Sequence, residues 1–189
     1  NIGKALAGNR DKMIIQGHIG SVDLNEQYDI SRNLKVCKQY FENLLRFLNT
    51  DYIDFGMLFF LDSEEAFDQV FQGGIADYAQ RLKEQGIIRA IGASSHNPII
   101  AKRVVETGLV DLLMFSINPA FDMTPAKKDV LETFDDTSSA QEYVGIDAAR
   151  AELYRVCQQR EVGISAMKTL GSGKLLSSEH TPLGPHMTF

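Results

Sequence analysis

Residues 87–98 read IIRAIGASSHNP, an apolar run that changes within a few positions into a polar turn and a helix start. The run from Ile87 to Ser94 is almost continuously apolar, a pattern typical of a parallel strand that is covered on both faces. Asn97 and Pro98 are residue types preferred at the N-cap and at the first position of a helix. The stretch therefore predicts a strand that leads through a short turn into a helix, the basic unit of an α/β fold.

The same unit recurs along the chain. Four further apolar runs have strand length: KMIIQG (12–17), YIDFGMLFF (52–60), VDLLMFSI (110–117) and VGISAMK (162–168). Helical patterns alternate with them over residues 31–49, 62–71, 75–85, 97–108 and 147–162. Ser31 is the expected N-cap of the first helix, and Asp62 with Glu65 forms an expected capping box for the second. This alternation predicts right-handed crossovers and a parallel sheet, and it leaves open whether the sheet is doubly wound or part of a barrel.

One segment, residues 118–146, interrupts the alternation. It is long and polar, it is acidic at Asp135 and Asp136, and a short helix is expected to begin at Thr124 and Pro125. Loops of this length are either functional lids or poorly ordered segments, and the sequence favours neither.

Composition and charge exclude several classes of protein. A chain of 189 residues with 44% hydrophobic residues predicts one globular domain over residues 1–189. A formal net charge of −6 argues against nucleic-acid or anionic-membrane partners. No apolar run approaches the roughly 20 residues of a membrane-spanning helix, and the start of the chain has no signal-peptide pattern, so we expect a cytoplasmic protein. Cys37 and Cys157 are expected in the core.

Five stretches resemble the aldo-keto reductases in order and spacing. They are GNRDKMIIQGHIG (8–20), TDYIDFGMLFF (50–60), LKEQGIIRAIGASSHNP (82–98), TGLVDLLMFSINPAFD (107–122) and VGISAMKTLGSGKLL (162–176). The chain looks most like the bacterial branch that carries a carboxy-terminal 4Fe-4S ferredoxin-like extension. The resemblance implies a partial (β/α)₈ TIM barrel with about five βα units, strands 3 to 7 of the family barrel. Because a whole barrel needs about 250 residues, the first two units are expected before Asn1, and the eighth unit with any extension after Phe189. A self-contained open sheet is the structural alternative.

The resemblance also implies a chemistry. Aldo-keto reductases transfer a hydride between NADP(H) and a small carbonyl compound, using Asp, Tyr, Lys and His, of which Asp and Tyr would precede Asn1. By position, His18 replaces the lysine and Phe59 replaces the histidine. Imidazole titrates near about pH 6.5, against about 10.4 for lysine, so His18 would be mostly neutral, and Phe59 cannot exchange a proton. The alternatives for these two positions are a hydrogen-bonded rim residue for His18 and a core residue for Phe59, and His96 or another group would have to take over the missing role.

The cofactor contacts follow from the same resemblance. Ser94 and Ser95 match the residues that hold the nicotinamide carboxamide, although short polar side chains also begin turns. Met114 and Met167 replace a glutamine and an aromatic ring; a thioether can pack on a flat ring, and it also fills cores. The turn after the seventh strand resembles the pyrophosphate-binding turn, or it simply starts a helix; its residues are Lys168, Thr169, Leu170, Gly171, Ser172, Gly173 and Lys174.

Two competing functions remain at this level. The four substituted positions are equally expected of a catalytically impaired barrel that acts as a binding or regulatory protein. A metal pair of His18 and His96 would support hydrolysis or lyase chemistry, but two histidines supply too few ligands, and no metal site is expected. No Cys-x-x-Cys motif occurs, so a 4Fe-4S cluster is expected only in a longer chain.

Overall fold

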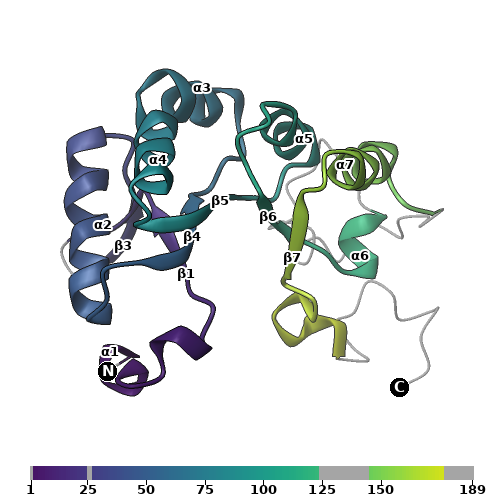
Figure 1. Cartoon of the computed structure of the whole chain (residues 1–189). Coiled ribbons are helices and arrows are strands. Elements are labelled where there is room, and N and C mark those ends of the chain that lie inside the picture. Colours follow the sequence, from purple (N-terminus) through teal and green to yellow (C-terminus); the bar gives the residue numbers. More distant parts are fainter. Residues whose placement is uncertain (1, 25–26, 124–144, 177–189) are drawn as a thin grey trace.

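The computed structural model describes residues 2–24, 27–123 and 145–176. Helices and strands alternate through this part of the chain (Figure 1). The elements are α1 (Ile2–Leu6), η1 (Arg10–Lys12), β1 (Gln16–Ile19), β2 (Ser21–Leu24), β3 (Gln27–Ile30), α2 (Leu34–Leu48), β4 (Ile53–Leu58), α3 (Glu64–Gln72), α4 (Ile75–Glu84), β5 (Ile88–Ser95), α5 (Pro98–Glu106), β6 (Leu112–Ser116), α6 (Pro119–Asp122), α7 (Ala148–Gln159), β7 (Gly163–Met167) and η2 (Gly171–Leu176). In the described residues, no helix is long and apolar enough to cross a membrane.

The main sheet has five parallel strands in the order β1-β4-β5-β6-β7. The order follows the sequence without reversal, so every crossover runs in the same direction. A doubly wound sheet reverses its order at a switch point, whereas a (β/α)₈ barrel does not. The winding is therefore that of part of a barrel, with β1 and β7 as its edges in the described residues.

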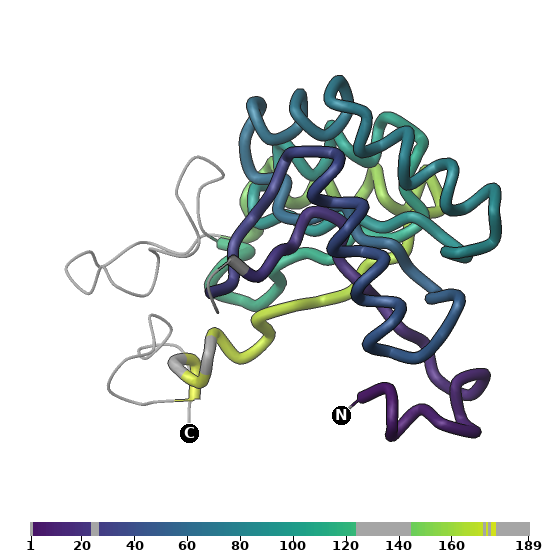
Figure 2. Tube along the Cα trace, turned by 90° about the vertical axis from the view of Figure 1, so that its left-hand side faces the viewer, coloured from purple at the N-terminus to yellow at the C-terminus, as the bar shows by residue number. Residues whose placement is uncertain are grey.

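The helices cover one face of this sheet. Helices α2, α4, α5 and α7 follow one another along its outer side (Figure 1), and the view turned by 90° shows the helical coils gathered on that side of the strands (Figure 2). Between helices and strands lies the main hydrophobic core. This core contains every second residue of the central strands, such as Ile91 and Ala93 of β5 and Leu113 and Phe115 of β6. The opposite face of the sheet carries the other set of side chains.

Several local predictions need correction. The first strand begins at Gln16, because residues 10–12 form a 3₁₀ turn instead. Helix α2 is capped by Asn33, whose side chain accepts hydrogen bonds from the next turn, and Ser31 only bonds the Asn33 amide. The cap of α3 is Ser63, and Asp62 bonds elsewhere.

Helix α1, strands β2 and β3 and helix α6 were not predicted, and one prediction lies outside the described residues. The antiparallel hairpin of β2 and β3 follows β1 directly. Helix α6 begins inside the 118–146 segment, with Asn118 as its N-cap. The expected helix from Thr124 falls outside the described residues. Cys37 and Cys157 are buried free thiols, as predicted.

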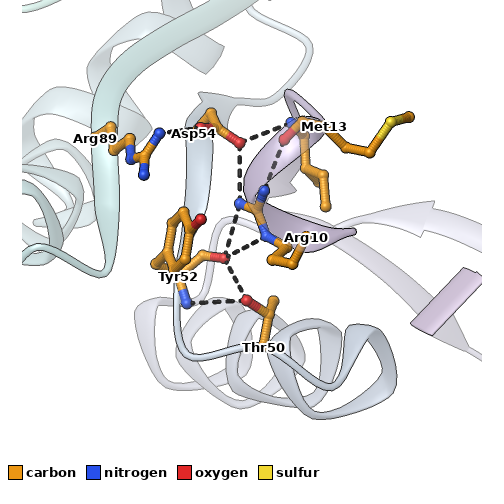
Figure 3. A network of polar contacts seen from close by, with 7 residues as sticks. Arg10, Met13, Thr50, Tyr52, Asp54 and Arg89 are labelled. Atoms are coloured by element: carbon orange, nitrogen blue, oxygen red, sulfur yellow. Dashed lines mark hydrogen bonds and ion pairs between the residues drawn. The ribbon is translucent and has the colours of Figure 1, made fainter. Parts of the chain in front are cut away.

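A buried polar network closes the amino-terminal ends of β1, β4 and β5 (Figure 3). The Asp54 carboxylate accepts hydrogen bonds from Arg10 at 2.9 Å, from Arg89 at 3.0 Å and from the Ile15 amide at 2.9 Å. Both guanidinium groups lie over the Tyr52 ring. Burial raises the pKa of Asp54, but these hydrogen bonds and the two positive charges outweigh burial and leave that pKa below its usual value. These contacts stabilise the amino-terminal end of the sheet. In a (β/α)₈ barrel, functional residues lie at the opposite end, where the strands have their carboxyl ends.

Candidate active site

The carboxyl ends of the five parallel strands meet at one edge of the sheet. His18 of β1 is in register with Met57 of β4, and Met57 is in register with Gly92 of β5. Ser94 lies two residues beyond Gly92 and is in register with Met114 of β6. Because partners in a parallel ladder share a face and side chains alternate along a strand, these residues share the face that the helices do not cover.

Two more predicted residues belong to this face. Phe59 lies two residues beyond Met57, next to the end of β4. Met114 is in register with Ser165 of β7, and Met167 lies two residues further along. The five positions predicted one by one along the strands are therefore brought together at the carboxyl edge of one face: His18, Phe59, Ser94, Met114 and Met167.

A row of aromatic rings crosses the ends of β1, β4 and β5. The centroid of the His18 ring lies 4.4 Å from that of Phe59, which is followed by Phe60 at 5.9 Å and His96 at a further 5.2 Å. Tyr28 of the hairpin meets Phe59 edge-on at 5.6 Å. The row keeps the two histidines at opposite ends, so they do not form a metal-binding pair. In the described part of the chain, no three potential ligand side chains gather as a metal site.

His18 is half-buried, and burial lowers its pKa below the ordinary value of 6.5. The imidazole is therefore neutral at neutral pH. This agrees with the expectation that His18 does not replace the permanent positive charge of a lysine. Phe59 is 7% exposed and packs among rings.

The two serines at the end of β5 have different surroundings. The Ser94 hydroxyl accepts a hydrogen bond from the Phe60 amide at 2.9 Å, and within residues 2–24, 27–123 and 145–176 no acceptor takes its own proton. Ser95 lies on the helix-covered side, and its hydroxyl donates to Asp62 at 3.0 Å and accepts from the Asn97 amide. Of these two serines, Ser94 is the one that offers its hydroxyl to the face that carries His18 and Phe59.

Asp62 forms the centre of a carboxylate–imidazole pair. Its Oδ2 lies 2.8 Å from His96 Nδ1, and its Oδ1 accepts hydrogen bonds from the His96 amide and from Ser95. Burial raises the pKa of Asp62, but the hydrogen bonds and charge of His96 more than offset burial and leave the pKa below its usual value. The carboxylate is therefore ionised and holds the imidazole by Nδ1.

Arg32 fixes the backbone beside this pair. Its guanidinium donates to the carbonyl oxygens of Phe59 at 2.8 Å and Phe60 at 2.7 Å. Phe60 has a positive φ of 54°, an unfavourable conformation for a bulky residue. We attribute the persistence of this conformation to the two Arg32 bonds together with the bond from the Phe60 amide to Ser94.

Sequence reasoning missed both Asp62 and Arg32. Asp62 resembled a helix cap, and its position directly after a buried strand was the available signal for a site residue. Arg32 follows the hairpin and has no local motif, so only the folded structure reveals its role.

The turn after β7 lies at the same edge of the sheet. The side-chain amide of Asn118 anchors this turn by donating a hydrogen bond to the Lys168 carbonyl oxygen at 2.9 Å. The amides of Gly171 and Gly173 bond back within the turn. Within the described residues, the amides of Thr169 and Leu170 have no hydrogen-bond partner, and both residues are exposed. The predicted Ser172 side chain lies outside the described part.

Helix α6 and the start of α7 are joined by a buried guanidinium. Arg150 is fully buried and donates from Nη1 to the Ser116 carbonyl oxygen at 2.9 Å and to Asp122 at 3.2 Å. Asp122 also accepts from the Tyr154 hydroxyl at 2.5 Å, which contributes with burial to raising the pKa of Tyr154. This cluster positions the chain that leaves β6 beside the turn after β7.

A cavity of about 580 Å³ opens at the β1 edge, between the hairpin and α2. Its lining includes His18 and Tyr28, so it adjoins the aromatic row. The volume lies in the range of small-molecule sites.

The Aldo/keto reductase family profile matches residues 1–188. The chain belongs to the aldo/keto reductase family. No curated protein sequence gives a significant match. Family membership agrees with the singly wound sheet and with a candidate site at the carboxyl ends of its strands.

Solved aldo/keto reductases share this fold. An aldo-keto reductase from Bacillus halodurans, in its holo form, aligns with a TM-score of 0.64 at 22% identity over 92% of this chain and 49% of its own. A glycerol dehydrogenase from Gluconobacter oxydans gives a TM-score of 0.61 at 19% identity, over 100% and 49% of the two chains. An aldo/keto reductase from Klebsiella pneumoniae in complex with NADP and acetate gives 0.58 at 16% identity, over 96% and 53%. This chain thus spans about half the length of these solved relatives.

Proposed function

We propose that the protein is an NADP(H)-dependent oxidoreductase that acts on a small carbonyl compound. The observation that carries this proposal is the common face at the carboxyl edge, where His18, Phe59, Ser94, Met114 and Met167 meet beside the turn after β7. Active sites of (β/α)₈ enzymes are built at this end of the strands. A cytoplasmic location is part of the same proposal.

The residues present fit a nicotinamide dinucleotide. The Ser94 proton is free to donate to a carboxamide oxygen, and the half-buried Met114 and Met167 thioethers suit the face of a flat ring. The Thr169 and Leu170 amides, which have no partner among the residues that the structure describes, suit a pyrophosphate. Lys168, Leu170, Gly171 and Ser172 complete the proposed set. Ser95 contributes by holding Asp62. When bound, the nicotinamide supplies the reducing equivalents for the carbonyl group. NADP, rather than NAD, is proposed because the Klebsiella pneumoniae relative is in complex with NADP.

The acid–base residues differ from the family pattern. His18 is a neutral imidazole, and Phe59 has no polar atom to orient a carbonyl oxygen. We therefore expect the double variant His18→Lys with Phe59→His to be more active in aldehyde reduction than the wild type. Unchanged or lower activity in a folded double variant would contradict these assignments.

Titration with NADPH tests the proposal. Saturable quenching of the protein fluorescence, together with aldehyde-dependent NADPH oxidation, is the expected result. Binding without oxidation of any aldehyde would instead support a barrel that serves as a binding or regulatory protein. No binding at millimolar NADPH would contradict the proposal as a whole.

The two remaining parts of the proposal concern the longer protein. We propose a single (β/α)₈ domain in which residues 118–146 form a long βα loop. The cysteines of this chain do not fit an iron-sulfur cluster, because Cys37 and Cys157 are buried on separate helices, α2 and α7. A 4Fe-4S cluster would have to be held by cysteines of a longer chain.

A further inference from the structure

Ser116 lies at the carboxyl end of β6, among the residues proposed to hold the nicotinamide. It follows Met114 by two residues on the same strand and is in register with Met167 of β7. Phe115 and Ile117, the residues on either side of Ser116, both pack into the core beneath the helices. Because side chains alternate along a strand, the Ser116 side chain lies on the opposite face, which carries Met114 and Met167.

The Ser116 hydroxyl is buried without a partner. The residue is fully buried, and in the part of the chain that the structure describes its Oγ makes no hydrogen bond. A buried polar group without a partner is unfavourable, and native structures contain few such groups. Ser116 thus holds an unused hydrogen-bonding group on the face of the proposed cofactor site.

Arg150 has buried polar atoms of the same kind, but they lie on the other side of β6. Its Nε and Nη2 atoms have no partner among residues 2–24, 27–123 and 145–176. The guanidinium lies 4.9 Å from the centroid of the Phe115 ring, on the side that the helices cover. From there Nη1 donates to the Ser116 carbonyl oxygen at 2.9 Å. Arg150 therefore fixes the backbone of Ser116 and leaves the serine hydroxyl free on the site face.

A second buried hydroxyl lies diagonally across from Ser116. Ser94 of β5 is in register with Met114, so it lies on the neighbouring strand and two residues nearer its start. Strands are about 4.8 Å apart and rise about 3.3 Å per residue, so the Cα atoms of the two serines are roughly 8 Å apart. A primary amide that makes one hydrogen bond through its oxygen and one through its nitrogen spans about this separation.

From this geometry we propose that Ser116 accepts a hydrogen bond from the amino group of the nicotinamide carboxamide, while the carboxamide oxygen accepts from Ser94. A primary amide has both an acceptor oxygen and N–H donors, so Ser94 alone would leave the amino group without a partner. Met114 and Met167 offer only weak thioether acceptors beside it. Both are half-buried and have flexible, unbranched side chains, which can turn aside and let the carboxamide reach the two hydroxyls. This inference rests on the proposed oxidoreductase function.

A cofactor analogue separates the two hydroxyl contacts without any turnover. In the acetylpyridine analogue of NADPH, a methyl group replaces the amino group of the carboxamide, and the carbonyl oxygen is kept. Equilibrium titration gives the preference of the protein for NADPH over this analogue as a ratio of dissociation constants. We expect Ser116→Ala to reduce that preference about 3- to 10-fold, the range of one hydrogen bond between neutral groups. The matched control is Ser94→Ala, which should weaken the binding of both compounds and keep the preference.

Unfolding of the cofactor-free protein gives a second readout. A hydroxyl that bonds only the cofactor adds nothing favourable to the free fold, so the urea midpoint of Ser116→Ala should equal or exceed that of the wild type. A lower midpoint would show that the hydroxyl has a partner in the free protein and would overturn the proposal. An unchanged preference in Ser116→Ala would overturn it while leaving the oxidoreductase function intact. Failure of the wild type to bind NADPH would overturn both.

Discussion

Asp54→Asn should destabilise the protein by about 2–3 kcal/mol. The Oδ2 atom accepts from the Arg10 guanidinium and from the Ile15 amide. In Asp54→Asn the Ile15 bond loses its charged acceptor and the Arg10 bond loses its ionic partner, a loss of about 1 kcal/mol apiece. The bond to Arg89 adds at most about 0.5 kcal/mol, because that guanidinium side chain is 62% exposed. For a domain of this size, the sum corresponds to a fall in Tm of about 5–10 °C. Urea and thermal unfolding of both proteins at neutral pH would measure it.

The stability difference between the wild type and Asp54→Asn should also depend on pH. The pKa of Asp54 is lower in the folded state than in the unfolded chain, so its contribution is fully present above about pH 4. That contribution disappears as the pH falls through the folded-state pKa, and the difference between wild type and Asp54→Asn should shrink accordingly. Arg89→Met, which removes only the exposed arm, should cost less than about 1 kcal/mol. A loss below about 0.5 kcal/mol for Asp54→Asn, or a difference that persists in acid, would refute the reasoning.

Two further predictions concern packing. Gly92→Ala would place a methyl group against the sulfur of the buried Met57, so we expect urea unfolding to show a loss of about 1–3 kcal/mol in the free energy of unfolding. An unchanged free energy of unfolding would show that Met57 moves freely. Burial raises the pKa of Cys157 to about 11 and also raises the pKa of Cys37. We therefore expect neither thiol to react with a disulfide reagent in the native protein at pH 8, and both to react in urea. Fast reaction of the native protein would instead place the thiols at the surface.

The sheet was predictable from the sequence because its central strands, β4, β5 and β6, are largely buried. Two successive apolar runs, one with Ile91 and the next with Leu113, are typical of parallel strands that are covered on both faces. The cap of α5 was also predictable, since Asn97 has a residue type that bonds the first turn of a helix. The periodicity did not distinguish a barrel from an open sheet, and the unreversed strand order decides it.

The candidate site was predictable only in part. Residues at strand ends, such as His18 and Ser94, could be located by counting, because alternation determines their face. The roles of Asp62 and Arg32 depend on bonds to residues about 30 positions away. The hairpin of β2 and β3 was missed because each strand has only four residues, SVDL and QYDI, and an alternation this short is a weak signal.

The most direct test of the nicotinamide site uses the methionine methyl groups as reporters. Met114 and Met167 lie on the proposed site face, whereas Met13 is 52% exposed beside the Asp54 network at the opposite end. With ¹³C-methyl methionine, titration with NADPH should shift the Met114 and Met167 signals in a saturable manner and leave Met13 unchanged. Shifts at Met13 alone, or no shift at Met114 and Met167 at saturating NADPH, would contradict the placement of the cofactor at the carboxyl edge of the sheet.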